Sequence, residues 1–154
     1  MSTSDSFDHV LRQWVDVFMT RSHHHLIRYL KTADLSMAQF GTLMRLRHEA
    51  HCGVGDIAEQ MSISNAAASQ LVDKLVQHGL VERTEDADDR RAKRLSLTSK
   101  GSYVLERSHD ARLAWTRNLA LHLDPQRRAA ITAALESLIT AAEAAEEAAP
   151  EHWK

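Results

Sequence analysis

Residues 55–101 read GDIAEQMSISNAAASQLVDKLVQHGLVERTEDADDRRAKRLSLTSKG, and their pattern specifies the fold. Ile57, Ala58 and Met61 recur at helical spacing and predict a short helix. A second helix is expected from about residue 65 to residue 78, and Gly79 follows it as the glycine that commonly ends a helix. The stretch therefore begins as two helices joined by a tight turn.

The second of these helices has two unlike faces. Its predicted inward stripe consists of apolar side chains, namely Ala67, Ala68, Leu71, Val72, Leu75 and Val76. Its predicted outward face is mostly small, neutral and hydrogen-bonding, and consists of Asn65, Ala66, Ser69, Gln70, Asp73, Lys74 and Gln77. Such a face lets a helix approach the major groove of DNA closely and offer donors and acceptors to base edges and phosphates. The predicted DNA contacts here are Ser62, Ser64, Asn65, Ser69, Gln70 and Lys74, of which Ser62 and Ser64 are also candidate helix caps.

A charged hairpin follows the second helix. Residues 80–83 and 93–97 alternate like two short strands, with Leu95 and Leu97 inward and Arg94 and Ser96 outward. Their connecting loop contains Asp89, Arg90 and Arg91, and residues 88–100 carry five basic and two acidic side chains. Adjacent arginines at a hairpin tip can enter the narrow minor groove, and a neighbouring aspartate can orient the guanidinium. We therefore predict a winged helix-turn-helix over residues 36–101 that binds DNA, with Asp89, Arg90, Arg91 and Arg94 at the hairpin contacts.

The same stretch resembles the MarR family of bacterial transcriptional regulators. The most specific part of the match is the hairpin sequence DADDRR followed by LTSKG. The family usually has a proline after the first Asp of this loop, where this chain has Ala87. By resemblance, Asp89 and Arg91 form the Asp-x-Arg pair of the wing, Arg91 is the minor-groove residue, and Arg90 is the alternative. The resemblance also implies a homodimer, usually a repressor, whose helices beside the winged region bind aromatic or phenolic anions.

The flanking segments are predicted to be helical and to dimerise. Residues 1–35 form an N-terminal helix with an apolar stripe, and a further helix spans 37–48 after the cap at Leu35-Ser36. Residues 102–154 are predicted to form C-terminal helices. Thr98 caps the first of them, and Asp124-Pro125 starts the last. The last helix has a narrow apolar seam that consists of Ile131, Leu135, Leu138, Ile139 and Ala142. Because these stripes need a partner, we expect a homodimer that reads a pseudo-palindromic site in major grooves roughly 34 Å apart. The alternative is a monomeric bundle.

Composition bounds the remaining classes of function. The 154 residues are 44% hydrophobic, with five glycines and two prolines, which favours one compact, mainly helical subunit. There is neither an apolar run of roughly 20 residues nor a signal-peptide layout at the start, so we expect a cytoplasmic protein without a membrane partner. Because the chain lacks a glycine-rich phosphate loop and a nucleophile motif, it is not expected to be an enzyme, and no cofactor is predicted.

Two kinds of regulatory site are suggested more weakly. Aromatic and histidine side chains could line an effector pocket, although such residues at helical spacing are more often plain core; they are Trp14, Phe18, His25, Tyr29 and Trp115. His48 and Cys52 stand at i and i+4 and could share a zinc ion if one helix continued through both, but Gly53 indicates that it does not. A redox switch at Cys52 is poorly supported.

The function predicted from the sequence is that of a sequence-specific DNA-binding transcriptional regulator, a repressor by family habit, released by a small effector. The alternatives are a metal-responsive regulator of the same fold that uses histidine and cysteine, and a winged-helix module that binds proteins without DNA specificity.

Overall fold

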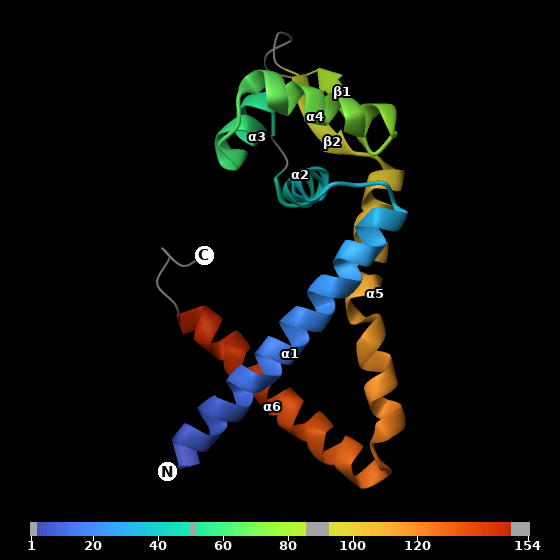
Figure 1. Ribbon diagram of the computed structural model, residues 1–154. Helices are drawn as coiled ribbons and strands as arrows, with labels where there is room; N and C mark the ends of the chain where they lie inside the picture. The colour runs from blue at the N-terminus through green and yellow to red at the C-terminus, as the bar shows by residue number, and fades with distance from the viewer. Residues whose placement is uncertain (1–2, 50–51, 86–92, 149–154) are drawn as a thin grey trace. The chain divides into compact units, whose positions relative to one another are not determined.

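The computed structural model describes residues 3–49, 52–85 and 93–148, and its side chains at 5–49, 52–84 and 94–145. The elements in chain order are α1 (Thr3–Thr32), α2 (Met37–His48), α3 (Val54–Met61), α4 (Asn65–Gln77), β1 (Val81–Glu85), β2 (Lys93–Leu97), α5 (Ser99–Leu119), a short 3-10 turn η1 (Ala120–His122) and α6 (Pro125–Ala148). The prediction of a mainly helical chain with one two-stranded hairpin is confirmed (Figure 1). The chain forms two compact units, residues 1–114 and 115–154.

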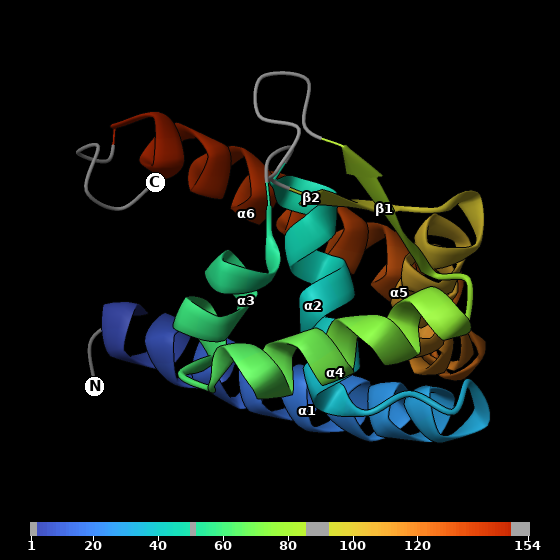
Figure 2. The same ribbon diagram turned by 90° about the horizontal axis from the view of Figure 1, so that it is seen from above.

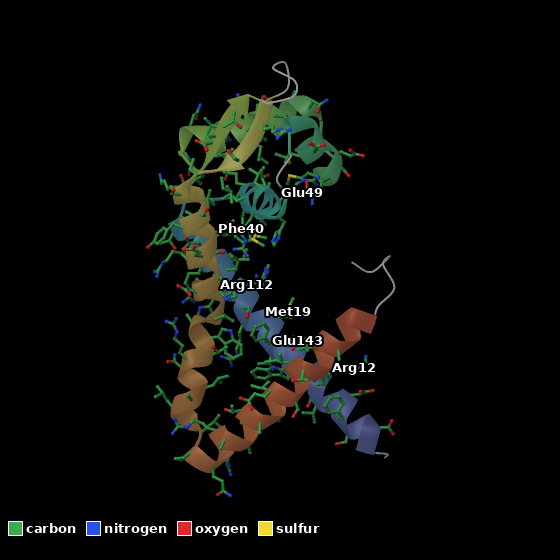
Figure 3. The ribbon with its side chains drawn as sticks, turned by 180° about the vertical axis from the view of Figure 1, so that it is seen from behind. Arg12, Met19, Phe40, Glu49, Arg112 and Glu143 are labelled. Carbon is green, nitrogen blue, oxygen red and sulfur yellow. The ribbon has the colours of Figure 1, made fainter. Side chains whose placement is uncertain are left out.

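Helix α2 begins and ends at the residues that the sequence predicts. Ser36 accepts a hydrogen bond from the Gln39 amide at 3.1 Å, and the Gln39 side chain accepts one from the Ser36 amide at 2.8 Å. This reciprocal capping box satisfies two amides that the helix leaves unpaired. At the other end the backbone turns extended at Glu49, so the helix stops at His48. Figure 3 labels Phe40 in the first turn of α2 and Glu49 just past its last turn.

The turn between α3 and α4 is built from two serines with different roles. Ser62 ends α3 in the left-handed region, with φ of 52°. Ser64 caps α4, because its hydroxyl accepts a hydrogen bond from the Ala67 amide at 3.2 Å. At the C-terminal end of α4, Gly79 takes φ of 68° and donates to the Val76 carbonyl, while the Leu80 amide donates to the Leu75 carbonyl. These two bonds form the glycine-ended cap that the sequence predicts.

The hairpin pairs β1 and β2 in antiparallel register, from Val81 opposite Leu97 to Glu85 opposite Lys93. The first strand starts one residue later than predicted and extends two residues further, while the second has the predicted bounds. Leu95 is buried, and its amide donates to the Cys52 carbonyl at 2.9 Å, which joins the hairpin to the segment before α3. Leu97 is half-buried, so both leucines point inward as the alternation predicts.

The core of the first unit lies among α2, α3, α4 and the hairpin, with the ends of α1 and α5 beside it. Its fully buried side chains include Leu43 from α2, Ile57 from α3, Val72 and Leu75 from α4, Leu95 from β2, and Leu105 from α5. Figures 1 and 2 show α4 lying across α2, with α3 at its N-terminal end and the hairpin following its C-terminal end. This packing holds one face of α4 in the core and turns the other outward.

The caps predicted for the last two helices are present. Thr98 accepts a hydrogen bond from the Gly101 amide at 3.0 Å in the first turn of α5, and Asp124 accepts one from the Arg127 amide at 2.8 Å in that of α6. The seam residues Ile131, Leu135 and Ile139 of α6 are exposed. Among the described residues, no helix is both long and apolar enough to cross a membrane.

Candidate nucleic-acid interface

The outward face of α4 and the turn before it carry six of the ten DNA contacts predicted from the sequence. Ser64, Asn65, Gln70 and Lys74 are each exposed or half-buried, as is Ser62 in the preceding turn. These side chains offer hydroxyl, amide and ammonium groups, which are the groups that contact base edges and phosphates. The first two turns of α4 and the turn before it thus form one polar surface that solvent reaches.

Two residues of this helix lie differently from the predicted stripes. Ala67 is exposed, whereas the sequence pattern places it inward. It lies at the edge of the stripe, and Ala68 alone reaches the core in this turn because the two positions are about 100° apart around the axis. Ser69 is half-buried rather than fully outward, which leaves Gln70 as the more accessible group in the second turn.

The middle of α4 carries an ion pair that the sequence analysis missed. The Arg83 guanidinium on β1 donates to the Asp73 carboxylate at 2.6 Å. An unpaired carboxylate on a helix facing DNA would repel phosphates, and Arg83 neutralises it. The alternation of residues 80–83 predicts that the Arg83 side chain points outward. Its partner Asp73 lies ten positions earlier, beyond a turn, so no local spacing in the sequence reveals the ion pair.

The hairpin contributes one described candidate. Arg94 of β2 is half-buried and stands opposite Thr84 in the strand register. The predicted tip contacts Asp89, Arg90 and Arg91 lie outside the described residues. Their roles therefore remain predictions from the sequence.

The candidate effector residues lie on α1 and α5, and four of the five belong to the first compact unit. Trp14 and Phe18 are neighbours on α1, with ring centroids 6.2 Å apart. Half-buried Tyr29 donates from its hydroxyl to the Val104 carbonyl of α5 at 3.1 Å, and burial raises the pKa of this phenol. His25 is half-buried on α1, and Trp115 is buried but belongs to the second compact unit. Figure 3 labels Arg12 and Met19 on the stretch of α1 that carries the two rings.

The helix needed for the His48 and Cys52 metal pair does not exist. Because α2 ends at His48 and the chain turns extended at Glu49, the two side chains are not one helical turn apart. His48 is exposed, whereas Cys52 is 1% exposed, and burial raises the pKa of its thiol. Within residues 3–49, 52–85 and 93–148, no cluster of three or more histidine, cysteine, aspartate or glutamate side chains could hold a metal ion.

This chain is similar to known transcriptional regulators in sequence and in fold. The model of the MarR family matches residues 35–93. The HTH-type transcriptional regulator YfiV of Bacillus subtilis is 32% identical over 111 residues, which are 71% of this chain and 69% of that protein. The transcriptional regulator Tm0710 of Thermotoga maritima has a similar fold, with a TM-score of 0.74 at 23% identity over 93% of this chain and 98% of that one. The MepR–DNA complex of S. aureus is also similar, with a TM-score of 0.59 at 21% identity over 86% and 98% of the two chains.

Proposed function

This chain belongs to the MarR family, as its hairpin motif indicates, and we propose that it is a homodimeric transcriptional regulator that binds a pseudo-palindromic DNA operator. The observation that carries the proposal is the outward face of α4. Its N-terminal half presents Ser64, Asn65 and Gln70 to solvent while Ala68 and Val72 fix the opposite face in the core. A rigid helix with small polar groups on its outer face is the form in which the major groove is read.

The structurally similar protein MepR has been crystallised with DNA, and the likeness extends over 86% of this chain. That likeness supports DNA as the partner, and the polar outer face of α4 supports this helix as the reading element. The hairpin is the second expected contact, through Arg94 and, at the tip, Asp89, Arg90 and Arg91. We assign α4 to the major groove and the hairpin tip to the minor groove beside it.

Exposed apolar side chains on α1 support the homodimer. Phe7, Val10 and Val17 share one face of the helix and are 57%, 59% and 45% exposed. A stripe of this kind is costly in water, and a second copy of the chain would cover it. We expect Val10→Glu to convert the dimer to a monomer in light-scattering chromatography. His9→Glu, about 100° away around the same helix, is the control and should leave the mass unchanged.

The proposed direction of regulation is repression, because a dimer seated on an operator excludes other proteins from the same DNA. We further propose that an aromatic or phenolic anion releases it, with Trp14, Phe18, His25, Tyr29 and Trp115 as the candidate contacts. Such an effector acts by binding the released state better than the DNA-bound one. Benzoate in the DNA titration is a first probe of this class, and lower affinity in its presence is the expected result.

Fluorescence anisotropy with the chain's own upstream DNA and a shuffled duplex, at several salt concentrations, tests the function. We expect tight, salt-dependent binding that prefers the native duplex. Gln70→Ala should reduce this preference by about 1 to 3 kcal/mol for each base that the glutamine reads. Gln77→Ala, an exposed glutamine in the last turn of the same helix, is the matched control and should retain the preference.

Arg91→Ala separates DNA binding from a protein-interaction role. If Arg91 contacts the minor groove, its replacement weakens binding to all duplexes and makes the salt dependence shallower. Equal and weak binding of the parent protein to both duplexes would contradict the proposed function. A change in DNA affinity on adding zinc would instead favour the metal-responsive alternative.

A further inference from the structure

The three consecutive backbone carbonyls of residues 78–80, just past the end of α4, are hydrogen-bonded by Thr98 and Lys100 at the start of α5. The Lys100 ammonium donates to the His78 carbonyl at 2.8 Å. The Thr98 hydroxyl donates to the Gly79 carbonyl at 2.7 Å, and the Thr98 amide donates to the Leu80 carbonyl at 3.1 Å. A helix leaves its last carbonyls without partners inside the helix, and Lys100 satisfies the one at the C-cap His78, while Thr98 satisfies the next two carbonyls of the connection to β1.

The same two segments approach each other too closely for a side chain at one position. A Cβ atom at Gly101 would clash with the Leu80 carbonyl oxygen. Gly101 is buried, and its amide donates to the Thr98 hydroxyl, which in turn donates to Gly79. We call this set of contacts, made by Thr98, Lys100 and Gly101 on the carbonyls of residues 78–80, the α4–α5 latch.

We propose that the latch sets the angle of α4 on the DNA, and that Lys100 is a positioning residue and not a phosphate contact. This inference rests on the proposed function, because it takes α4 as the reading helix. The polar contacts predicted for α4 begin at Ser64 and Asn65, at the end of the helix opposite to the latch. A helix rises about 1.5 Å per residue, so Asn65 lies about 18 Å from the C-terminal end of α4.

The length of α4 makes small errors of angle matter. A tilt of about 5° at the latched end moves Asn65 by about 1.6 Å, given the rise of the helix. Hydrogen bonds to bases tolerate a donor–acceptor range of only about 0.5 Å. Core contacts of Ala68, Val72 and Leu75 hold α4 down along its length, and the latch adds polar, directional restraints just past its last turn. The first turn of α5 and the residues 78–80 that follow α4 therefore act as one rigid element.

Lys100 is one of the five basic residues of the segment 88–100 that also holds the predicted hairpin contacts, so the positioning role and a phosphate contact must be separated by experiment. We would compare Lys100→Met, which keeps the aliphatic stem, with Lys31→Met, which removes the same charge from an exposed position on α1. Thr98→Val removes the hydroxyl of the latch, whereas Thr98→Ser keeps it. Each protein is titrated with the upstream and shuffled duplexes across salt and is probed by amide hydrogen exchange over residues 75–83.

The positioning role predicts a specific pattern. Lys100→Met and Thr98→Val should lower the ratio of specific to shuffled affinity about tenfold, the size of effect expected when one hydrogen bond is removed, with the salt slope unchanged. Hydrogen exchange at the end of α4 should be faster in both, while Thr98→Ser and Lys31→Met should behave as the parent protein. If the variants melt at a lower temperature but keep the parent's affinity ratio, the latch is purely structural and the proposal is overturned.

A phosphate contact gives the opposite pattern. If Lys100 binds phosphate, Lys100→Met lowers the salt slope by about 0.9 for each phosphate that is no longer neutralised and leaves the affinity ratio intact, which would overturn the positioning role. The exchange measurement does not depend on DNA. If the parent protein does not prefer the upstream duplex, the proposed function fails, and unchanged exchange in both variants would independently show that the latch does not restrain α4.

Discussion

The guanidinium of Arg83 and the carboxylate of Asp73 meet at 2.6 Å across the junction between the hairpin and α4. Their side chains are 32% and 48% exposed, so the pair lies at the surface and not in the core. It joins the strand that leads to the hairpin tip to the middle of the helix predicted to enter the major groove. The two expected DNA-contacting elements are thus linked directly, in addition to their shared core.

We expect this link to have a small but measurable energy. In a double-mutant cycle of Asp73→Asn and Arg83→Met, the coupling energy from urea unfolding should be about 0.2 to 1 kcal/mol, because exposed ion pairs are screened by water. Salt at about 1 M should reduce it further. The exposed pair Arg107 and Asp110, at 3.9 Å, is the control and should couple less. Equal coupling energies for the two pairs would count against the link.

The two serines of the turn should respond in opposite directions. Ser64→Ala removes the hydroxyl that caps α4 and should lower the free energy of unfolding by about 1 kcal/mol. Ser62→Gly should preserve or raise it, since Ser62 occupies the left-handed region with φ of 52°, where glycine has no steric penalty. Denaturant unfolding without DNA measures both. If Ser62→Gly lowered the free energy of unfolding as much as Ser64→Ala, the left-handed backbone angle at Ser62 would not be a source of strain in the turn.

Two glycines give a matched test of close packing. Gly101→Ala would put a methyl group against the Leu80 carbonyl, so α5 or β1 must move, and we expect a loss of about 1 to 3 kcal/mol or more. Gly41 lies inside α2 with no atom within 4 Å of its added Cβ, so Gly41→Ala should stabilise the protein by about 0.5 to 1 kcal/mol. Thermal melting of the two variants distinguishes them. If Gly101→Ala left the melting temperature unchanged, the backbone around the latch could move to make room for the methyl group at little cost.

The Cys52 thiol should react slowly in the folded protein, and it should make the free energy of unfolding fall as the pH becomes alkaline. Burial raises the pKa of its thiol above the ordinary value, despite the opposing effect of Arg45. The folded protein therefore keeps the proton at a pH where the unfolded chain loses it. This contribution is complete below the ordinary thiol pKa and is lost as the pH rises above it.

The measurement is the pH dependence of unfolding in the parent protein and in Cys52→Ala. The difference between them should be constant at neutral pH and shrink from about pH 8.5 upward, and taking the difference cancels the effect of the raised pKa of Tyr29. Iodoacetamide should label Cys52 more slowly in the folded protein than in urea. Rapid labelling of the folded protein would contradict burial as the dominant effect.

Local patterns predicted most of the winged region correctly. The turn serine at position 64, the glycine at 79 and the threonine at 98 act on backbone groups within a few residues, so each cap can be inferred from sequence alone. The alternation in 93–97 has the same local character. Ala67 is the exception, because an alanine at the edge of a stripe is small enough to lie on either side without cost.

The order of the elements, their caps and the polar outer face of α4 thus follow from the amino-acid order, since these features depend on periodicity and on hydrogen bonds between near neighbours. Which distant groups meet is a property of the folded chain: Asp73 with Arg83, Lys100 with the His78 carbonyl, and Gly101 against Leu80. Those contacts span 10 to 22 positions of the chain, and their geometry is set by how α4, the hairpin and α5 pack around a shared core. Packing of that kind has no periodic signature in the sequence, because it depends on three-dimensional distance.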